Sequence, residues 1–210
     1  MPIFNDVSIP DSQMCKTALE FVKASHEPFL LNHVMRTYFF GSLAAQRASA
    51  KLDQEMFFLG AVMHDLGLVE DYVRDNRFEI DGANAAADFL LGAGYPDDKI
   101  EIVWDAIALH TTLGIPQSKR PEIGLVQLGA GIDVGVVPLE MLDSQFVDEV
   151  LVEYPRADFK NKMLERIAEV VGRKPHMAMH TFAEDILERH VEGHHRHNFC
   201  DAMHGSAFAE

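Results

Sequence analysis

Apolar side chains recur at three- and four-residue steps along nearly the whole chain, and this period limits the fold more than any other feature. Within residues 30–50, for example, Leu30, Val34 and Tyr38 share one side of a predicted helix. The same period predicts helices over 53–63, 82–91, 96–110, 121–133, 144–152, 158–171 and 176–189. No alternating pattern competes with these helices, and only short runs such as 134–137 are ambiguous. We therefore predict a single compact all-α domain.

Two residues mark the ends of the helix predicted over 53–63. Asp53 precedes its first apolar residue, where an aspartate side chain can accept hydrogen bonds from the first backbone N–H groups. Gly67 follows its last residues, and glycine suits the left-handed conformation in which many helices end. We therefore expect Asp53 to cap this helix and Gly67 to stop the chain behind it.

The charge of the chain limits its partners. There are 33 acidic and 18 basic residues, which give a formal net charge of -15 with histidine neutral. Such a surface repels nucleic-acid phosphates and anionic membranes, so we expect neither as a partner. A small anionic substrate is not excluded, because a metal ion can reverse the local potential.

Cysteine usage and the first residues indicate the compartment. Cys15 and Cys200 are the only cysteines, so a disulfide framework is not expected. The opening residues MPIFNDVSIPDSQM lack the basic and apolar regions of a signal peptide, and no apolar stretch is long enough to cross a bilayer. We expect a cytoplasmic protein.

Several histidines and aspartates are embedded in apolar helical segments. They are His33, the adjacent pair His64 and Asp65, His110, and Asp133. Burial of such groups without a partner costs a few kcal/mol each, and convergence on one cation would offset that cost. Taken singly, each residue is more often a satisfied core residue, a helix cap or a chance pairing than a metal ligand. Only their ordered combination is informative.

That order resembles the HD-domain superfamily of metal-dependent phosphohydrolases and related enzymes: a histidine, then a His-Asp pair, then a distant aspartate. The surrounding segments resemble the cyanamide hydratase-like branch, namely LNHVMRTYFFG, LGAVMHDLGL, RFEIDGANAA and AIALHTT. The resemblance runs from about residue 29 to 134. It implies one HD-type helical domain over 1–210, with a metal-site core at 29–134 and a helical C-terminal extension and tail over 140–210.

The resemblance also implies a metal site. It makes His33, His64, Asp65 and Asp133 the ligands of one divalent ion. Zinc or iron suits this nitrogen-rich set best, and manganese, cobalt or nickel are alternatives. Many dinuclear members carry a further histidine where this chain has Phe78, so we expect one ion and a free His110.

Such an ion would lower the pKa of bound water toward about 7 and make it a nucleophile. Asp65 would take part in catalysis as a ligand, and His110 and Thr111 are the candidates for a partner acid. Arg36 and Glu79 are candidates for contact with the substrate, and Phe78 for the wall of a small, dry pocket.

Three functions follow as alternatives. The first is a hydratase or hydrolase for a small neutral molecule, such as a nitrile; cyanamide would give urea. The second is a nucleotide or phosphate-ester phosphohydrolase. Only Arg36 and Arg77 lie near the motif residues to bind the phosphate groups, and two arginines are few for a triphosphate. The third is a regulatory module that contains a metal and binds a small ligand.

The C-terminal segment is rich in histidine, with His190, His194, His195 and His197 close together. We expect adventitious metal binding there rather than a physiological site. The apolar end, residues 199–208, is expected to pack on the body or on a partner subunit, which would make a homodimer.

Overall fold

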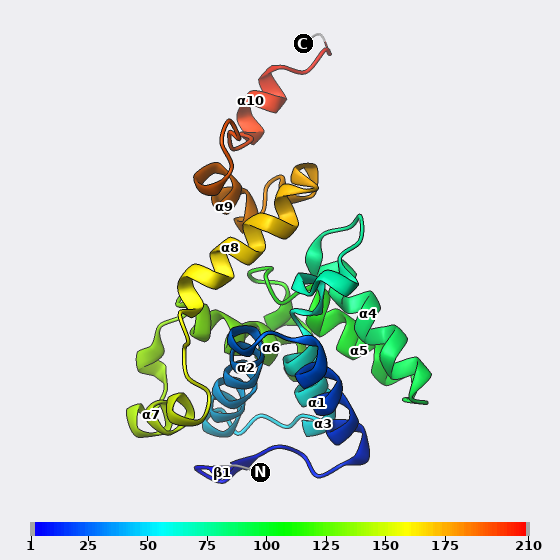
Figure 1. Cartoon of the computed structure of the whole chain (residues 1–210), viewed down its shortest axis with the longest axis vertical. Coiled ribbons are helices and arrows are strands. Elements are labelled where there is room, and N and C mark those ends of the chain that lie inside the picture. The colour runs from blue at the N-terminus through cyan, green and yellow to red at the C-terminus, as the bar shows by residue number, and fades with distance from the viewer. Residues whose placement is uncertain (1–2, 209–210) are drawn as a thin grey trace.

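The computed structural model describes residues 3–208, and the outermost residues of the predicted domain 1–210 lie outside this range. The fold is all-α, as predicted (Figure 1). The α-helices are α1 (Gln13–Ser25), α2 (Pro28–Arg47), α3 (Gln54–Met63), α4 (Phe78–Gly92), α5 (Asp97–Ala108), α6 (Pro121–Val134), α7 (Ser144–Glu153), α8 (Phe159–Gly172), α9 (Phe182–His190) and α10 (Phe199–His204). The short 3-10 helices are η1 (Leu66–Leu68), η2 (Glu70–Tyr72), η3 (Pro116–Ser118), η4 (Leu139–Met141) and η5 (Pro175–Ala178). Two short antiparallel strands, β1 (Ile3–Phe4) and β2 (Val7–Ser8), precede them.

Helix α3 begins as the sequence predicts. The Asp53 side chain accepts hydrogen bonds from the backbone N–H groups of Glu55 and Met56. Helix α4 begins at Phe78, one turn before the predicted start, and the segment predicted as one helix over 176–189 divides into η5 and α9. Helix α1 was not predicted, although Ser12 caps it and its buried residues recur at helical steps.

Helices α2 and α6 cross at glycines. A Cβ on Gly129 of α6 would lie 2.2 Å from the carbonyl oxygen of Thr37 in α2, and a Cβ on Gly41 would lie 2.8 Å from that of Leu125. Thr37 is about one turn beyond His33, and Gly129 is about one turn before Asp133. The close crossing therefore brings these two predicted site residues together.

Gly67 serves a different purpose from the predicted one. It lies inside η1 and is not among the residues with a positive φ, so the expected left-handed stop is wrong. A Cβ at this position would lie 1.8 Å from the carbonyl oxygen of Phe78, at the start of α4. The glycine lets the backbone just after Asp65 lie directly against α4.

The buried apolar side chains form two clusters. The larger joins the N-terminal hairpin to helices α1–α7, and the smaller joins the start of α2, η1 and the start of α4 to α8, η5 and α9. Lys174 supports the second junction: its buried Nζ lies 2.5 Å from the Asp81 carboxylate and donates to the Arg74 carbonyl oxygen at 2.7 Å. This ion pair fastens the C-terminal extension to α4.

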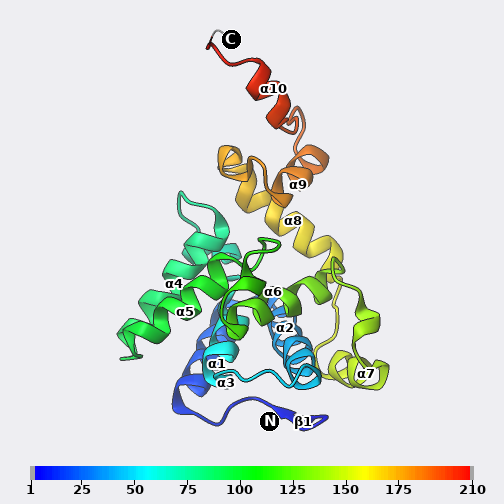
Figure 2. The same ribbon diagram turned by 180° about the vertical axis from the view of Figure 1, so that it is seen from behind.

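The C-terminal helices lead away from the main body. Figures 1 and 2 show α8 leaving it, with α9 and α10 progressively farther out and the N-terminal hairpin at the opposite end. Helix α10 contains no buried residue, and Phe199 and Phe208 are exposed. The apolar end is therefore not packed on the body. No helix in residues 3–208 has the length and apolar character needed to cross a membrane.

Candidate metal centre

Three predicted ligands meet where α2 passes the end of α3. His33 projects from α2, and His64 and Asp65 follow the last residue of α3; all three are buried. The Nε2 atoms of His33 and His64 are 3.1 Å apart, and each lies 3.3 Å from Oδ2 of Asp65. A buried His/His/Asp group that could hold a metal ion is therefore present.

The other ring nitrogens fix how these imidazoles carry their protons. His64 Nδ1 lies 2.8 Å from the carbonyl oxygen of Ala61, which can only accept a hydrogen bond. His33 Nδ1 lies 2.7 Å from Oδ2 of Asp133, also an acceptor when ionised. Both Nδ1 atoms therefore carry the hydrogen, and in the neutral rings both Nε2 lone pairs point at each other and at a carboxylate.

A metal ion or a shared proton would stabilise such a convergence of acceptors. Zinc bonds to histidine and carboxylate ligands are about 2.0–2.2 Å long, so ligand atoms around a tetrahedral ion lie roughly 3.3 Å apart. The three separations, 3.1, 3.3 and 3.3 Å, match one face of such a tetrahedron. The donor set and its spacing fit one divalent metal ion with three protein ligands.

Asp133 was expected as a fourth ligand, but the structure does not bring it into this triangle. Its carboxylate faces the opposite ring nitrogen of His33. Arg36 binds it through Nε at 2.7 Å and through its terminal nitrogen at 2.8 Å, and Arg156 donates to Oδ1 at 2.7 Å. These three cationic or polar partners hold the carboxylate behind the imidazole, where it orients His33 as carboxylates behind metal-bound histidines commonly do.

The pKa shifts follow from these contacts. Burial alone would raise the pKa of Asp133, but the hydrogen bonds from His33 and Arg36 outweigh it and hold that pKa far below its usual range. Burial would lower the pKa of His33, but its hydrogen bonds with Asp133 and Asp65 raise it. A proton and a metal ion would thus compete for His33 Nε2, so metal affinity should decrease as the pH is lowered.

His110 stands beside this triangle. Its Nε2 lies 3.5 Å from Oδ1 of Asp65, and its ring centroid is 4.7 Å from that of His64. His110 Nδ1 faces the carbonyl oxygen of Ile107 at 2.7 Å and so carries the hydrogen. Burial, with the adjacent His64, lowers the pKa of His110 to about 4. The ring is therefore neutral at pH 7, and its Nε2 accepts protons.

The other predicted catalytic and binding residues are distributed around His110. The Thr111 hydroxyl donates to the buried Glu79 carboxylate, which also binds Arg77 at 2.6 Å. The ring of Phe78 meets His110 edge-on at 5.8 Å. Phe78 and Thr111 line the adjoining cavity, whereas Glu79 does not.

Arg36 does not reach the cavity either. Its side chain is fully buried, and beyond Asp133 it donates to the carbonyl oxygens of Tyr154 and Pro155 at 3.1 Å. Sequence reasoning missed two partners of this group. Arg156 lies on Asp133, and Phe159 stacks on the His33 ring with centroids 4.8 Å apart. No local pattern marks either residue, because both come from the connection to α8 and the start of that helix.

A cavity of about 370 Å³ lies above the metal triangle. His33, His64, Asp65 and His110 form its polar end. Apolar side chains form most of the rest, and they come from η1, α4, α6, α8 and α9: Leu68, Phe78, Ala130, Val134, Met163, Leu164, Ile167, Phe182 and Ile186. Helices α8 and α9, which lie outside the predicted metal-site core at 29–134, thus complete the wall.

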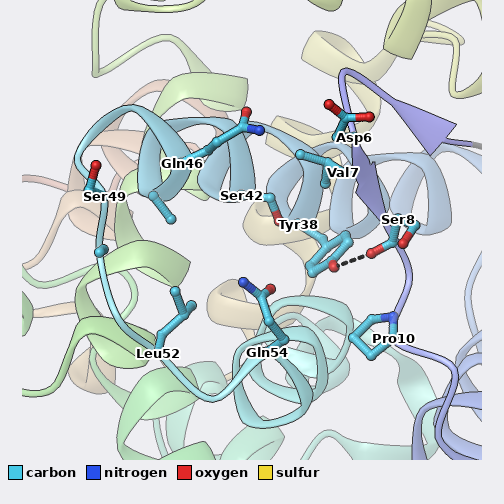
Figure 3. A pocket seen from close by; sticks show the side chains of 12 residues that line it. Asp6, Val7, Ser8, Pro10, Tyr38, Ser42, Gln46, Ser49, Leu52 and Gln54 are labelled. Carbon is cyan, nitrogen blue, oxygen red and sulfur yellow. Dashed lines mark hydrogen bonds between the residues drawn. The ribbon is translucent and has the colours of Figure 1, made fainter.

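A second cavity, of about 400 Å³, lies between the N-terminal hairpin and the ends of α2 and α3 (Figure 3). Its lining includes Tyr38, whose hydroxyl donates to the Ser8 carbonyl oxygen at 2.7 Å, together with Gln46 and Gln54. Asp6 is the only carboxylate among its lining residues, and no histidine is present there. The first cavity, where acceptors converge, is therefore the candidate functional site.

Elsewhere in residues 3–208, no other group of histidine, cysteine or carboxylate ligands has the spacing of a metal site, and the C-terminal histidines form none. The closest approach to one is His197 Nδ1 on the Glu184 carboxylate. No protein-family model matches the chain, and no curated protein matches it.

Proposed function

We propose that this chain is an HD-domain metalloenzyme that uses one divalent ion, zinc or ferrous iron, to add water to a small neutral substrate. The triangle of His33 Nε2, His64 Nε2 and Asp65 Oδ2 in the lining of a cavity carries this proposal. The distances between these three atoms match those between three ligands of a tetrahedral ion whose fourth coordination position is free. This arrangement is typical of catalytic rather than structural zinc.

A bound ion would lower the pKa of water and polarise the substrate. The protein's part is to keep the Nε2 lone pairs of His33 and His64 directed inward through Asp133 and the Ala61 carbonyl oxygen. Neutral His110 accepts a proton at Nε2 from the attacking water and returns it to the substrate. His110 thus begins the cycle as a base and ends it as an acid.

Thr111 takes a different part from the one expected of a proton donor. Its hydroxyl hydrogen is engaged by Glu79, which Arg77 holds in turn. The Thr111 oxygen already accepts a hydrogen bond from Arg77 at 3.4 Å. A hydroxyl oxygen has two lone pairs, and because Thr111 lines the cavity, the second can accept from a substrate N–H or from water. We assign to Thr111 and Glu79 the role of orienting the substrate or the attacking water.

The choice between a neutral and a phosphorylated substrate rests on charge. Among the described residues that line the cavity there is no lysine or arginine. Arg36 is bound to Asp133, Arg77 is bound to Glu79, and Arg196 is paired with Asp185 of the lining. A nucleotide triphosphate would have only the ion to balance its charge, so we favour a neutral electrophile such as a nitrile, of which cyanamide is the smallest example.

The test is turnover by protein restored with zinc or ferrous iron. We expect urea from cyanamide, or amide from another nitrile, and no phosphate release from a nucleotide panel. His110→Ala should retain the metal and lose about a hundredfold or more in turnover. His64→Ala should lose the metal, and His176→Ala, at an exposed position, should change neither metal content nor turnover. Phosphate release would favour the phosphohydrolase, and tight metal binding without any turnover would favour the regulatory module.

A further inference from the structure

We propose that the substrate carries an apolar aliphatic or aromatic group of about ten non-hydrogen atoms beside its reactive carbon, and that the cavity above the metal triangle binds this group. The chemistry of the inference rests on the proposed function. The binding part rests on the cavity alone and can be tested without turnover.

The size of the cavity is the first observation. Its volume of about 370 Å³ is large for a molecule such as cyanamide, which has three non-hydrogen atoms. A water molecule takes about 30 Å³ of the liquid, so the cavity has room for roughly twelve groups of that size. A nitrile or amide function at the metal end would leave most of this volume for the rest of the molecule.

The lining is the second observation. Met163, Ile167 and Ile186 of α8 and α9 line the cavity together with Leu68 and Phe78, and all five belong to the smaller apolar cluster. Polar side chains are concentrated at the metal end, apart from Gln127 and Asp185. Water in a space enclosed by such side chains lacks hydrogen-bond partners, so an apolar group is the favoured occupant.

The mouth is the third observation. Leu113, Val134 and Val136 line the cavity and yet are 75%, 47% and 70% exposed. Leu164 and Phe182 add further partly exposed apolar surface from α8 and α9. Single exposed apolar residues are ordinary, but a group around one opening is typical of a ligand-binding site.

The reaction on such a substrate balances with water alone. The water oxygen bonds to the nitrile carbon as a carbon–nitrogen π bond breaks. One water proton moves through His110 Nε2 to the nitrogen, and the second follows when the imidic acid rearranges to the amide. No other reactant is needed, and the apolar group remains in place throughout.

The experiment compares straight-chain nitriles from ethanenitrile to tetradecanenitrile on the metal-restored protein, a series that runs past the expected size of the apolar group. We expect kcat/KM to rise roughly fourfold with each added methylene until the cavity is filled. Ala130→Leu, which fills part of the α6 wall, should move the optimum to a shorter chain.

A matched pair of valines controls for folding. Val136→Asp changes the mouth, and Val152→Asp changes an exposed position of α7 that does not line the cavity. The ratio of kcat/KM between heptanenitrile and propanenitrile should fall about tenfold in Val136→Asp, because charge at the mouth opposes apolar burial. It should stay unchanged in Val152→Asp.

Binding supplies the readout that does not depend on turnover. Straight-chain amides should displace the neutral fluorescent probe N-phenyl-1-naphthylamine from the full chain with an affinity that rises with chain length. Length-dependent displacement without turnover of any nitrile would support this inference while the proposed function fails. Turnover of cyanamide with no dependence on chain length would overturn the inference and leave the proposed function standing, and equal effects of the two valine variants would also overturn it.

Discussion

Replacement of Asp133 by asparagine would test how the protein holds His33 ready for a metal ion. The substitution keeps the size of the side chain and removes its charge. In the folded protein the carboxylate receives hydrogen bonds of 2.7–2.8 Å from His33, Arg36 and Arg156. The Arg36 side chain is fully buried, so no solvent can replace the lost charge.

The first expected effect of Asp133→Asn is on stability. Removing one partner of a buried ion pair typically costs about 3–5 kcal/mol, because the remaining charge is left uncompensated. Asparagine retains one carbonyl oxygen for Arg36, and Arg156 is partly exposed. We therefore expect the lower end, a loss of about 3 kcal/mol in the free energy of unfolding.

The second effect is on the metal. If the asparagine oxygen takes the place of Oδ1, which accepts from both Arg36 and Arg156, its NH2 group faces His33 Nδ1, which must then accept rather than donate. The imidazole hydrogen moves to Nε2 and blocks the lone pair that faces His64. Loss of such supporting carboxylates costs 10–100-fold in metal affinity, and we expect roughly the upper end.

Urea unfolding and zinc titration against a competing chelator measure the two effects separately. Asp53→Asn is the control, because asparagine caps helices as well as aspartate does and the Asp53–Lys99 pair is partly exposed. It should cost less than about 1 kcal/mol and leave metal affinity unchanged. A folded Asp133→Asn protein that binds zinc as tightly as the wild type would refute the reasoning about the His33 proton.

Two further predictions concern packing and pH. Gly129→Ala places a Cβ 2.2 Å from the Thr37 carbonyl oxygen and should cost about 3 kcal/mol in urea unfolding, whereas Gly92→Ala in α4, with nothing within 4 Å, should be neutral or stabilising by up to about 1 kcal/mol. Equal stability of the two variants would contradict the close crossing of α2 and α6. Burial lowers the pKa of His26 from 6.5 to about 4, so its contribution to stability is present above pH 6.5 and is lost as the pH falls toward 4. His26→Gln should therefore reduce the stability lost between pH 7 and pH 5 by about 2 kcal/mol, and an unaltered pH dependence would rule this out.

The helices and the position of the buried His/His/Asp group could be predicted from the sequence because both depend on local signals. The three- and four-residue period and the Asp53 cap predicted most helices within a turn. The polar residues His33, His64 and Asp65 stood out within apolar helices, and the structure brings them together. Burial makes such groups converge, so their presence in apolar segments was informative.

The direction of the Asp133 side chain could not be predicted in the same way. A carboxylate beside the Nε2 atom of His33 could be a metal ligand. A carboxylate beside Nδ1 is a hydrogen-bond partner of the ring. The choice depends on Arg36 and Arg156, which compete for the same oxygens. Arg156 comes from a connection far along the chain, and no spacing in the sequence relates it to Asp133.

The cavity wall was missed for the same reason. Helices α8 and α9 were expected, but their apolar residues could have packed anywhere on the body. The buried Lys174–Asp81 pair, the contacts of α8 with η1 and the edge-on contact of Phe182 with Phe78 decide where they meet α4 and η1. These are long-range contacts, and a single sequence does not reveal which partners form them.

The most direct test of the central claim is the metal content of freshly purified protein, measured by elemental analysis after dialysis against a weak chelator. The His33, His64 and Asp65 triangle predicts one divalent ion per chain, retained in His190→Ala of the C-terminal segment and lost in His64→Ala. A folded His64→Ala protein that keeps its ion, or a wild-type protein that neither contains nor takes up one, would contradict the account.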